Sequence, residues 1–457
     1  MNSRSLKYSR GVALAYVVGA LAVLGILVGL GWRMIRANDV LVALDRWDAE
    51  ARLLAASGLD YALSQIGSAG SDQNLSYATD SLAYNLEDQN LSFDLKVRSY
   101  GLFGRAVSTG KTRLPREGRS KTKTALLGQR LDLSRLPTLG LLNREGNMVL
   151  AGHAEVSGPV LLWKGDVRKA TDIKVRWSGS KGHTGETWDS TVKIWDRIKP
   201  DFARAEDWFK RQEAMLSAHS FDGDGDFDAG TTQNSFLPDS GVLTDTVMSN
   251  CRIMGGRLLR ISDGVRLRDC KLLAENIVIK GNARLERVLA FAGQNLVVQG
   301  EAQLIGGQYV ARDTVALDLA TPFQAMPVFY AQGRRPHRGR PDSSYVGALI
   351  LKKAQGEGLF LSAMTDRLLE DHAIRLLVLP GARVSGLMFT SGLVRMEGHL
   401  QGSLICHNLK FEYDGTIWMG HLKDARITAF TEKKEVAAPL LFPGWPPMAI
   451  PVALRMP

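Results

Sequence analysis

The sequence predicts a mainly β protein. A single N-terminal transmembrane helix is expected to extend into an amphipathic helix, followed by a parallel β-helix with a partly helical insertion. Three observations lead to this fold class: apolar segments recur every nineteen residues in the middle of the chain, an uncharged apolar stretch lies near the N-terminus, and 46 of the 457 residues are glycine, which suits many tight corners. Because nineteen extended residues trace roughly 60 Å, one period matches one coil with three short faces.

The N-terminal segment predicts a membrane anchor. Residues 1–10 form a basic tip, and residues 11–32 carry no charge and are long enough to cross a hydrocarbon core. Since basic residues precede this span and acidic residues soon follow it, we expect the N-terminus in the cytoplasm and nearly all the rest of the chain outside it. Within the span, Gly25 and Gly29 form a GxxxG pair that permits close helix packing, although glycine is common in membrane helices generally.

The segment after the membrane span predicts a helical stalk over residues 33–67. Apolar residues return at helical spacing from Val40 to Ile66, and Gly67 is suited to end the helix. Residues 68–145 are expected to form a small α/β or linker region that holds a polar segment, a short strand from Phe93 to Val97 and a basic stretch.

The parallel β-helix is expected over residues 146–428. The run from Met148 to Leu162 has the alternation and glycine spacing of an entry coil. An insertion of about residues 171–240 interrupts the pattern, and a loop rich in Pro and Arg occupies residues 321–345. The Pro-rich tail of residues 429–457 lies where a cap is needed, because the last coil of such a fold must be protected.

The period also predicts which residues stack in neighbouring coils. One expected column comprises Ile253, Leu272, Phe291 and Val310, and another comprises Cys251, Cys270 and Leu289. Arg260 interrupts a column of Ile279, Val298 and Leu317. Leu267, rather than Arg266, carries the apolar character opposite Leu285 and Leu304, so a bulge is expected in that coil.

Two of the three cysteines are predicted to lie in adjacent coils. Cys251 and Cys270 would be about 4.8 Å apart in backbone, which is within the range of a disulfide. Stacked free thiols are the alternative, because in-register side chains point in parallel and Leu289 takes the next place. Cys406 has no evident partner.

An acidic segment is the candidate metal site, since alternating carboxylates supply the oxygen ligands that Ca²⁺ prefers. The carboxylates are those of Asp222, Asp224, Asp226 and Asp228. Phe227 and Gln233 stand where an EF-hand requires Gly and a bidentate Glu, so a solvated turn is the alternative. No other cofactor is expected.

No catalytic residue is assigned, and the chain is expected not to be an enzyme. The sequence contains no nucleophile motif, Gly-rich phosphate loop or zinc-ligand spacing. Acidic residues such as Asp269 and Glu286 are spread over the coils, which leaves open a carboxylate pair for carbohydrate chemistry. His399, His407 and His421 are interpreted as coil or turn residues.

The formal net charge of +10 suits nucleic acid, an anionic membrane surface or an acidic glycan. Much of the excess is local, in a basic stretch between residues 105 and 123 and in four arginines between residues 334 and 340, which are interpreted as solvated loops. Nucleic acid is not expected as a partner, because a position outside the cytoplasm suits phospholipid or anionic envelope polymers better.

Three parts of the sequence resemble known families. Gly381–Phe389 and Gly398–Ile405 carry a V-x-G-x-hydrophobic type of pattern and in this resemble bactofilins, bacterial proteins that form right-handed β-helices and polymerise into scaffolds. That resemblance implies a right-handed coil. Thr122–Gly128, Leu150–Leu162 and Pro439–Phe442 are similar to segments of an uncharacterised family of bacterial membrane-anchored β-helix proteins.

The N-terminus resembles that of minor pilins and of the largest minor pseudopilin of type II secretion. Arg10–Leu14 matches a prepilin-peptidase site with cleavage after Gly11, and a long helix follows. The fifth residue after that cut is Tyr16, where most pilins have Glu. An uncleaved signal anchor is the alternative.

These features predict a structural protein of the bacterial inner membrane, with the bulk of its chain in the periplasm. We expect it to act as a scaffold that assembles with envelope or secretion proteins or with itself. The alternatives are a minor pilin-like subunit of a type IV pilus or type II secretion machine, and a carbohydrate-binding or carbohydrate-acting β-helix.

Overall fold

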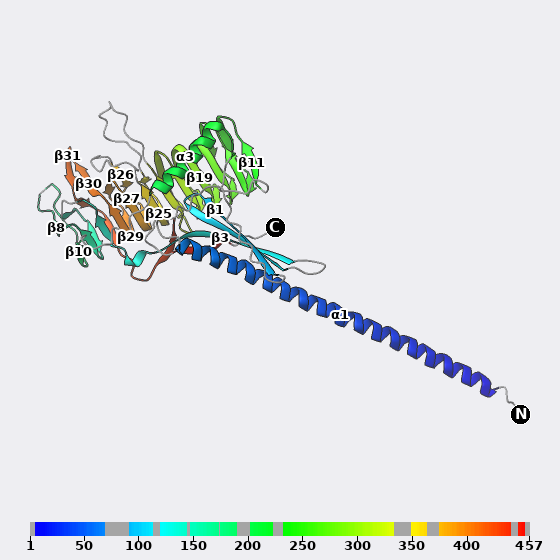
Figure 1. Cartoon of the computed structure of the whole chain (residues 1–457). Helices are drawn as coiled ribbons and strands as arrows, with labels where there is room; N and C mark the ends of the chain where they lie inside the picture. The colour runs from blue at the N-terminus through cyan, green and yellow to red at the C-terminus, as the bar shows by residue number, and fades with distance from the viewer. Residues whose placement is uncertain are drawn as a thin grey trace.

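The structure, a computed structural model, describes residues 5–68, 91–112, 119–143, 147–172, 174–189, 202–222, 232–332, 349–362, 374–439 and 447–452. The protein is mainly β, with one long apolar helix at its N-terminus. Figure 1 shows this helix, α1 (Ser5–Ser68), projecting from a body of strands on which its second half lies.

Helix α1 has two parts with different surroundings. Nearly all side chains from residue 16 to residue 42 are exposed, and by length and composition the helix can cross a membrane. Further along, Ala51, Ala55 and Ala62 are buried. Their small side chains let the helix lie close to a strand: a Cβ added at Gly110 would lie 2.2 Å from the carbonyl oxygen of Ala51. The expected stalk is therefore helical, and its second half is packed against the body.

The second half of α1 packs on an antiparallel sheet. Its strands are β1 (Leu91–Tyr100), β2 (Phe103–Thr112), β3 (Arg119–Asp132), β34 (Glu435–Ala438) and β35 (Pro447–Val452). Strand β2 pairs with β1 and β3, and both strands of the C-terminal tail pair with β3. The tail strands therefore join the antiparallel sheet through β3, and capping of the last coil by the tail stays a prediction.

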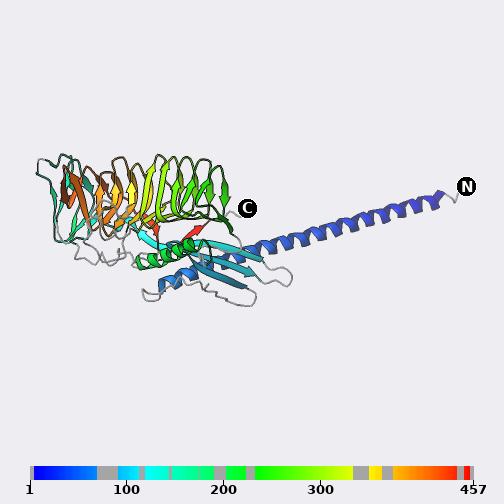
Figure 2. The ribbon, with the colours of Figure 1, turned by 90° about the horizontal axis from the view of Figure 1, so that it is seen from above.

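Most of the other strands pair in parallel, and we call them together the parallel stack (Figure 2). The strands before α3 (Phe202–Ala218) are β4 (Leu139–Leu141), β5 (Met148–Ala151), β6 (Glu155–Ser157), β7 (Val160–Leu162), β8 (Val167–Lys169), β9 (His183–Thr184) and β10 (Thr187–Asp189). After α3 come β11 (Gln233–Phe236), β12 (Ser240–Leu243), β13 (Val247–Ser249), β14 (Cys251–Met254), β15 (Leu258–Ile261), β16 (Arg266–Arg268), β17 (Lys271–Ile279), β18 (Arg284–Glu286), β19 (Leu289–Gly300), β20 (Gln303–Ile305), β21 (Gln308–Ala311), β22 (Thr314–Leu319) and β23 (Val328–Ala331).

The last strands of the stack are β24 (Leu349–Leu351), β25 (Gln355–Ser362), β26 (Ile374–Val378), β27 (Arg383–Thr390), β28 (Leu393–Met396), β29 (His399–Cys406), β30 (Asn408–Tyr413), β32 (His421–Lys423) and β33 (Arg426–Thr428). Strand β31 (Thr416–Met419) forms an antiparallel hairpin with β30. Two segments assigned to interruptions contain stack strands, namely β9, β10 and β11 within residues 171–240 and β23 within residues 321–345.

The repeat of the stack is not uniformly nineteen residues. Asn276 pairs with Asn295, nineteen positions on, whereas Leu272 pairs with Ala290 and Leu273 with Phe291, eighteen positions on. The register shifts between Ala274 and Asn276. The bulge expected beside Leu267 is not found, because β16 and β18 pair without a shift and Leu267 lies opposite Leu285. The earlier layer also repeats after eighteen residues, because Ile261 pairs with Ile279. Arg260 therefore interrupts no column and points outward, since it is exposed.

Alternation along the strands builds two apolar columns, one on each side of the backbone. The inner column lies in the core of the stack and comprises Ile253, Leu272, Ala290, Tyr309, Phe329, Phe360, Met388 and Leu404. The outer column is one residue further along each strand and comprises Met254, Leu273, Phe291, Val310, Tyr330, Leu361, Phe389 and Ile405. The column expected from the sequence joined the first two residues of the inner column, Ile253 and Leu272, to the third and fourth residues of the outer column, Phe291 and Val310.

The outer column is buried because α3 and the antiparallel sheet cover it. The rings of Trp208 and Phe209 lie 5.4 Å from that of Phe291, and Arg312 forms ion pairs of 3.2 and 3.3 Å with Glu206 and Glu213 of α3. The segment expected to be a partly helical insertion thus contains the amphipathic helix α3, which packs on the outer column.

Strands β4 to β10 stack on the last strands of the parallel stack, such as β29 and β33. Among the described residues, they do not stack on β11 to β13, which follow them in sequence. Leu139 pairs with Leu404 of β29, and Val156 pairs with Ile427 of β33. Figure 1 accordingly shows β8 and β10 at the same end of the stack as β30 and β31, opposite β11. The predicted entry coil from Met148 to Leu162 is thus joined to the C-terminal layers.

Candidate functional site

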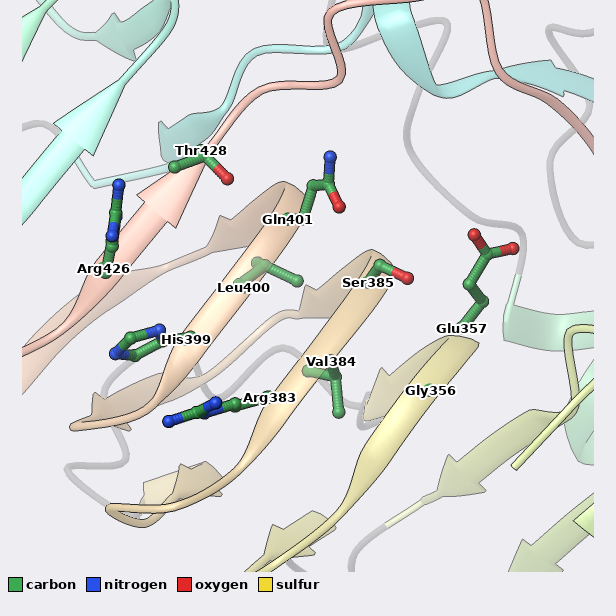
Figure 3. A pocket seen from close by; sticks show the side chains of 10 residues that line it. All are labelled: Gly356, Glu357, Arg383, Val384, Ser385, His399, Leu400, Gln401, Arg426 and Thr428. Atoms are coloured by element: carbon green, nitrogen blue, oxygen red, sulfur yellow. The ribbon is translucent and has the colours of Figure 1, made fainter. Parts of the chain in front are cut away.

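A groove opens on the outer surface of the parallel stack, across β25, β27, β29 and β33 (Figure 3). Its volume is about 370 Å³. It is lined by Gly356, Glu357, Arg383, Val384, Ser385, His399, Leu400, Gln401, Arg426 and Thr428.

The strand register arranges these side chains in two outward rows. Arg383, His399 and Arg426 are paired in sequence across three strands, and Ser385, Gln401 and Thr428 form the second row two residues further on. The residues between the rows, such as Val384 and Leu400, are buried in the core. Because side chains alternate along a strand, one cationic row and one polar row face the same groove, and the polar row begins with Glu357, which pairs with Ser385.

Glycines end the groove at a corner of the stack. Gly386 and Gly402 have φ values of +124° and +142°, which L side chains rarely adopt. A Cβ at Gly402 would lie 2.0 Å from the carbonyl oxygen of Gly386. The glycine of the V-x-G-x pattern therefore permits neighbouring layers to turn at the same place.

The cationic row has few acidic partners among the described residues. Arg426 lies 4.0 Å from Glu155, a carboxylate that also accepts a hydrogen bond of 2.9 Å from Ser180 Oγ, and this hydrogen bond lowers the pKa of Glu155. At the other edge, Glu357 is paired with Lys434 at 2.9 Å. Partial burial, together with the charges of Arg383 and Arg426, lowers the pKa of His399 below its ordinary value of 6.5. The row is thus electropositive, and its central imidazole favours the neutral form.

The structure places Cys251 and Cys270 together as free, buried thiols with their Sγ atoms 2.9 Å apart. The hydrogen bond to Cys270 and burial raise the pKa of Cys251. Leu289 is paired with Lys271 and so does not continue this column, because the layer repeats after eighteen residues there. Disulfide formation stays a prediction.

The candidate calcium ligands fall largely outside the described residues. Asp222 is described, and its backbone N–H donates to Ser220 Oγ at 3.0 Å. Asp224, Asp226 and Asp228 lie in the segment that is not described. Within the described ranges, no group of three or more His, Cys, Asp or Glu side chains is arranged to hold a metal ion.

The acids considered for carbohydrate chemistry include two that share a cationic partner. Arg287 forms ion pairs of 2.6 Å with Asp269 and 2.8 Å with Glu286, and the hydrogen bond to Asp269 raises the pKa of the arginine. These two carboxylates thus form a surface ion-pair cluster on the stack.

The predicted residues of the anchor are separated from all of these sites. Gly11 lies within α1, and Gly25 and Gly29 are exposed with no other part of the described chain within 4 Å of an added Cβ. Their roles in cleavage and helix packing stay predictions.

Sequence reasoning missed the groove, because it treated His399 as a coil residue and did not single out Arg383 and Arg426. A signal was present: in β27, β29 and β33 a basic residue directly precedes a buried apolar one, as in Arg383–Val384. Comparisons with protein-family models, curated proteins and solved structures find no match for this chain. The resemblances to bactofilins and pilins therefore depend on the quoted residues alone.

Proposed function

We propose that this chain is a membrane-anchored scaffold protein of the bacterial cell envelope, with its parallel stack coiled as a right-handed β-helix in the periplasm and acting through protein–protein assembly. The exposed apolar half of α1 supports the anchor. The observation that carries the assembly role is the layer formed by β11, β12 and β13, which stands at one end of the stack.

This end layer has an open edge in the described part of the chain. Strands β11, β12 and β13 each pair on one side only, with β14, β15 and β16. Phe236, Val242 and Val247 on these strands are 49%, 51% and 76% exposed. Unpaired strand edges with exposed apolar side chains favour association with another chain.

At the opposite end of the stack, β8, β9 and β10 also pair on one side only, with β5, β6 and β7, but their described apolar side chains, Val167 and Trp188, are half-buried. Trp177 packs against the core there, donates from Nε1 to the carbonyl oxygen of Ala154 at 3.1 Å, and has Lys169 Nζ 3.8 Å from its ring centre. Because exposed large apolar side chains lie on the edge strands of the β11–β13 end and, among the described residues, not on those of the other end, we favour a contact between two identical β11–β13 ends, and such a two-fold contact closes on itself. The partner that we propose is therefore a second copy of this chain.

Site-specific photocrosslinking in intact membranes tests this proposal. Two differently tagged full-length copies are produced together, with a photoreactive side chain at position 247 or, as a control, at position 417, where Ile417 of β31 is 55% exposed. We expect a product that contains both tags from position 247 and not from position 417. Equal yields at both positions, or no two-tag product, would refute assembly through the end layer.

A minor pilin-like subunit is the second candidate. One observation favours it: α1 continues without interruption from Ser5 to Ser68, and its second half packs on an antiparallel sheet. N-terminal sequencing of the membrane-extracted protein tests this candidate. A new terminus at Val12 supports it, and an intact Met1 contradicts it.

A further inference from the structure

The groove holds two guanidinium groups at a defined spacing. Arg383 and Arg426 belong to one outward row and are separated by one strand, so their backbones are about 10 Å apart at about 4.8 Å per strand. Among the described residues Arg383 has no ion-pair partner, and Arg426 has only the 4.0 Å contact with Glu155. Most of their donors are therefore free to bind carboxylate or phosphate oxygens.

The second row presents hydroxyl and amide groups beside these charges, and at its β25 end the carboxylate of Glu357, whose charge is paired with Lys434 at 2.9 Å. Ser385, Gln401 and Thr428 lie in register, and the same row continues through Ser157 to Thr184. Hydroxyl and amide groups both donate and accept, which suits a ligand that carries many hydroxyl groups. Partial burial and the two arginine charges lower the pKa of His399, and its neutral imidazole also offers one donor and one acceptor.

The groove fits other classes of polyanion less well. An extended acidic peptide gains most of its affinity by adding a strand to a free sheet edge, whereas β27 and β29 are paired on both sides. Single-stranded nucleic acid is bound mainly by large aromatic side chains on which its bases stack, and no Phe, Tyr or Trp lines this groove. The volume of about 370 Å³ lies within the range of small-ligand sites, roughly 300–1,000 Å³.

We propose that this groove binds a segment of an acidic glycan, with Arg383 and Arg426 holding acid groups on the sugar chain while Ser385, Gln401 and Thr428 hydrogen-bond its hydroxyls. The site is separate from the end layer, so assembly and glycan binding can fail independently. Binding here would attach the anchored protein to an anionic polymer of the envelope.

Titration calorimetry of the full-length protein in detergent micelles at low salt tests the proposal. The probes are a linear hexamer of mannuronic acid, maltohexaose as its neutral counterpart and hexa-aspartate as an acidic peptide. We expect the mannuronate hexamer to bind at least about tenfold more tightly than either control. Arg383→Gln and Arg426→Gln should each weaken its binding about tenfold, since a charged hydrogen bond contributes on that scale.

Arg260→Gln is the matched control, because Arg260 is an exposed arginine on an outer face of the same stack. It removes the same charge, and we expect binding within about twofold of the parent protein. An equal loss in Arg260→Gln would show attraction by net charge alone, and equal binding of hexa-aspartate would assign the groove to acidic peptides. Either result overturns the proposal. It is also overturned if the folded parent protein does not bind the mannuronate hexamer. Equal unfolding temperatures of parent and variants show that a loss of binding is not a loss of folding.

Discussion

Gln308 of the parallel stack forms hydrogen bonds with the β1–β2 turn of the antiparallel sheet. Its replacement by leucine should destabilise this contact between the two sheets. The side chain is 2% exposed. Its Nε2 donates to the carbonyl oxygen of Tyr100 at 2.9 Å, and its Oε1 accepts from the backbone N–H of Leu102 at 2.7 Å. The fit is close, since a Cβ added at Gly101, between these residues, would lie 2.3 Å from Oε1.

Leucine has a similar size and no polar atoms, so Gln308→Leu takes one partner from each of two backbone groups. Each buried group left without its hydrogen bond costs about 1–3 kcal/mol. We therefore expect the free energy of local opening at the contact between the β1–β2 turn and the stack to fall by about 2–6 kcal/mol. Local opening governs amide exchange, and a loss of 2 kcal/mol corresponds to about thirtyfold faster exchange.

Hydrogen–deuterium exchange measured by mass spectrometry on the full-length protein in micelles reads this effect. Peptides that contain the β1–β2 turn should exchange at least about thirtyfold faster in Gln308→Leu, while peptides from β27 and β29 keep their parent rates. Gln303→Leu in β20 is the control, because Gln303 is exposed. Exchange of the turn within twofold of the parent rate would refute the role assigned to Gln308.

Three further predictions concern the other features. Phe209→Ala removes a fully buried ring and should lower the free energy of unfolding by about 3–5 kcal/mol in urea titrations; a loss below about 1 kcal/mol would contradict the packing of α3 on the stack. A thiol oxidant should link Cys251 to Cys270, with a mass decrease of two hydrogen atoms that reductant reverses, since their Sγ atoms are already 2.9 Å apart. The pKa of His399, followed by NMR titration, should lie below 6.5 and rise in Arg383→Gln. Because the folded state binds this proton less readily than the unfolded chain, His399 should reduce stability as the pH falls through its unfolded pKa; an unchanged pKa in the variant would exclude the charge of Arg383 as a cause.

The repeat predicted the parallel pairing of β14 to β22 because apolar alternation within each strand must match that of its neighbours. It did not predict the shift between Ala274 and Asn276, since the eighteen-residue and nineteen-residue alignments place equally apolar residues opposite each other. For the same reason, the column predicted from the sequence combines residues of the inner and outer columns.

Two other features depend on contacts that local sequence does not specify. The sequence predicts that the segment of α3 is partly helical, but it does not predict where the helix packs. Phe209 packs on the outer column, whose residues the sequence assigned to stacking between coils. Neighbouring layers of the groove are separated by unequal lengths of chain, because Glu357 pairs with Ser385 (385 − 357 = 28), Arg383 with His399 (399 − 383 = 16) and His399 with Arg426 (426 − 399 = 27). No fixed period therefore brings these residues into register. The cationic row of the groove is visible only once β25, β27, β29 and β33 are aligned.

The pairing of β4 and β6 with β29 and β33 affects how the chain can fold during synthesis. Ser403 Oγ donates to the carbonyl oxygen of Pro137, a residue 266 positions earlier. Strands β4 and β6 therefore lack their final partners until nearly the whole protein has been synthesised. Contacts of such long sequence separation slow folding. A ribosome that stalls before residue 399 would leave these early strands exposed, so complete translation is a condition for burying them.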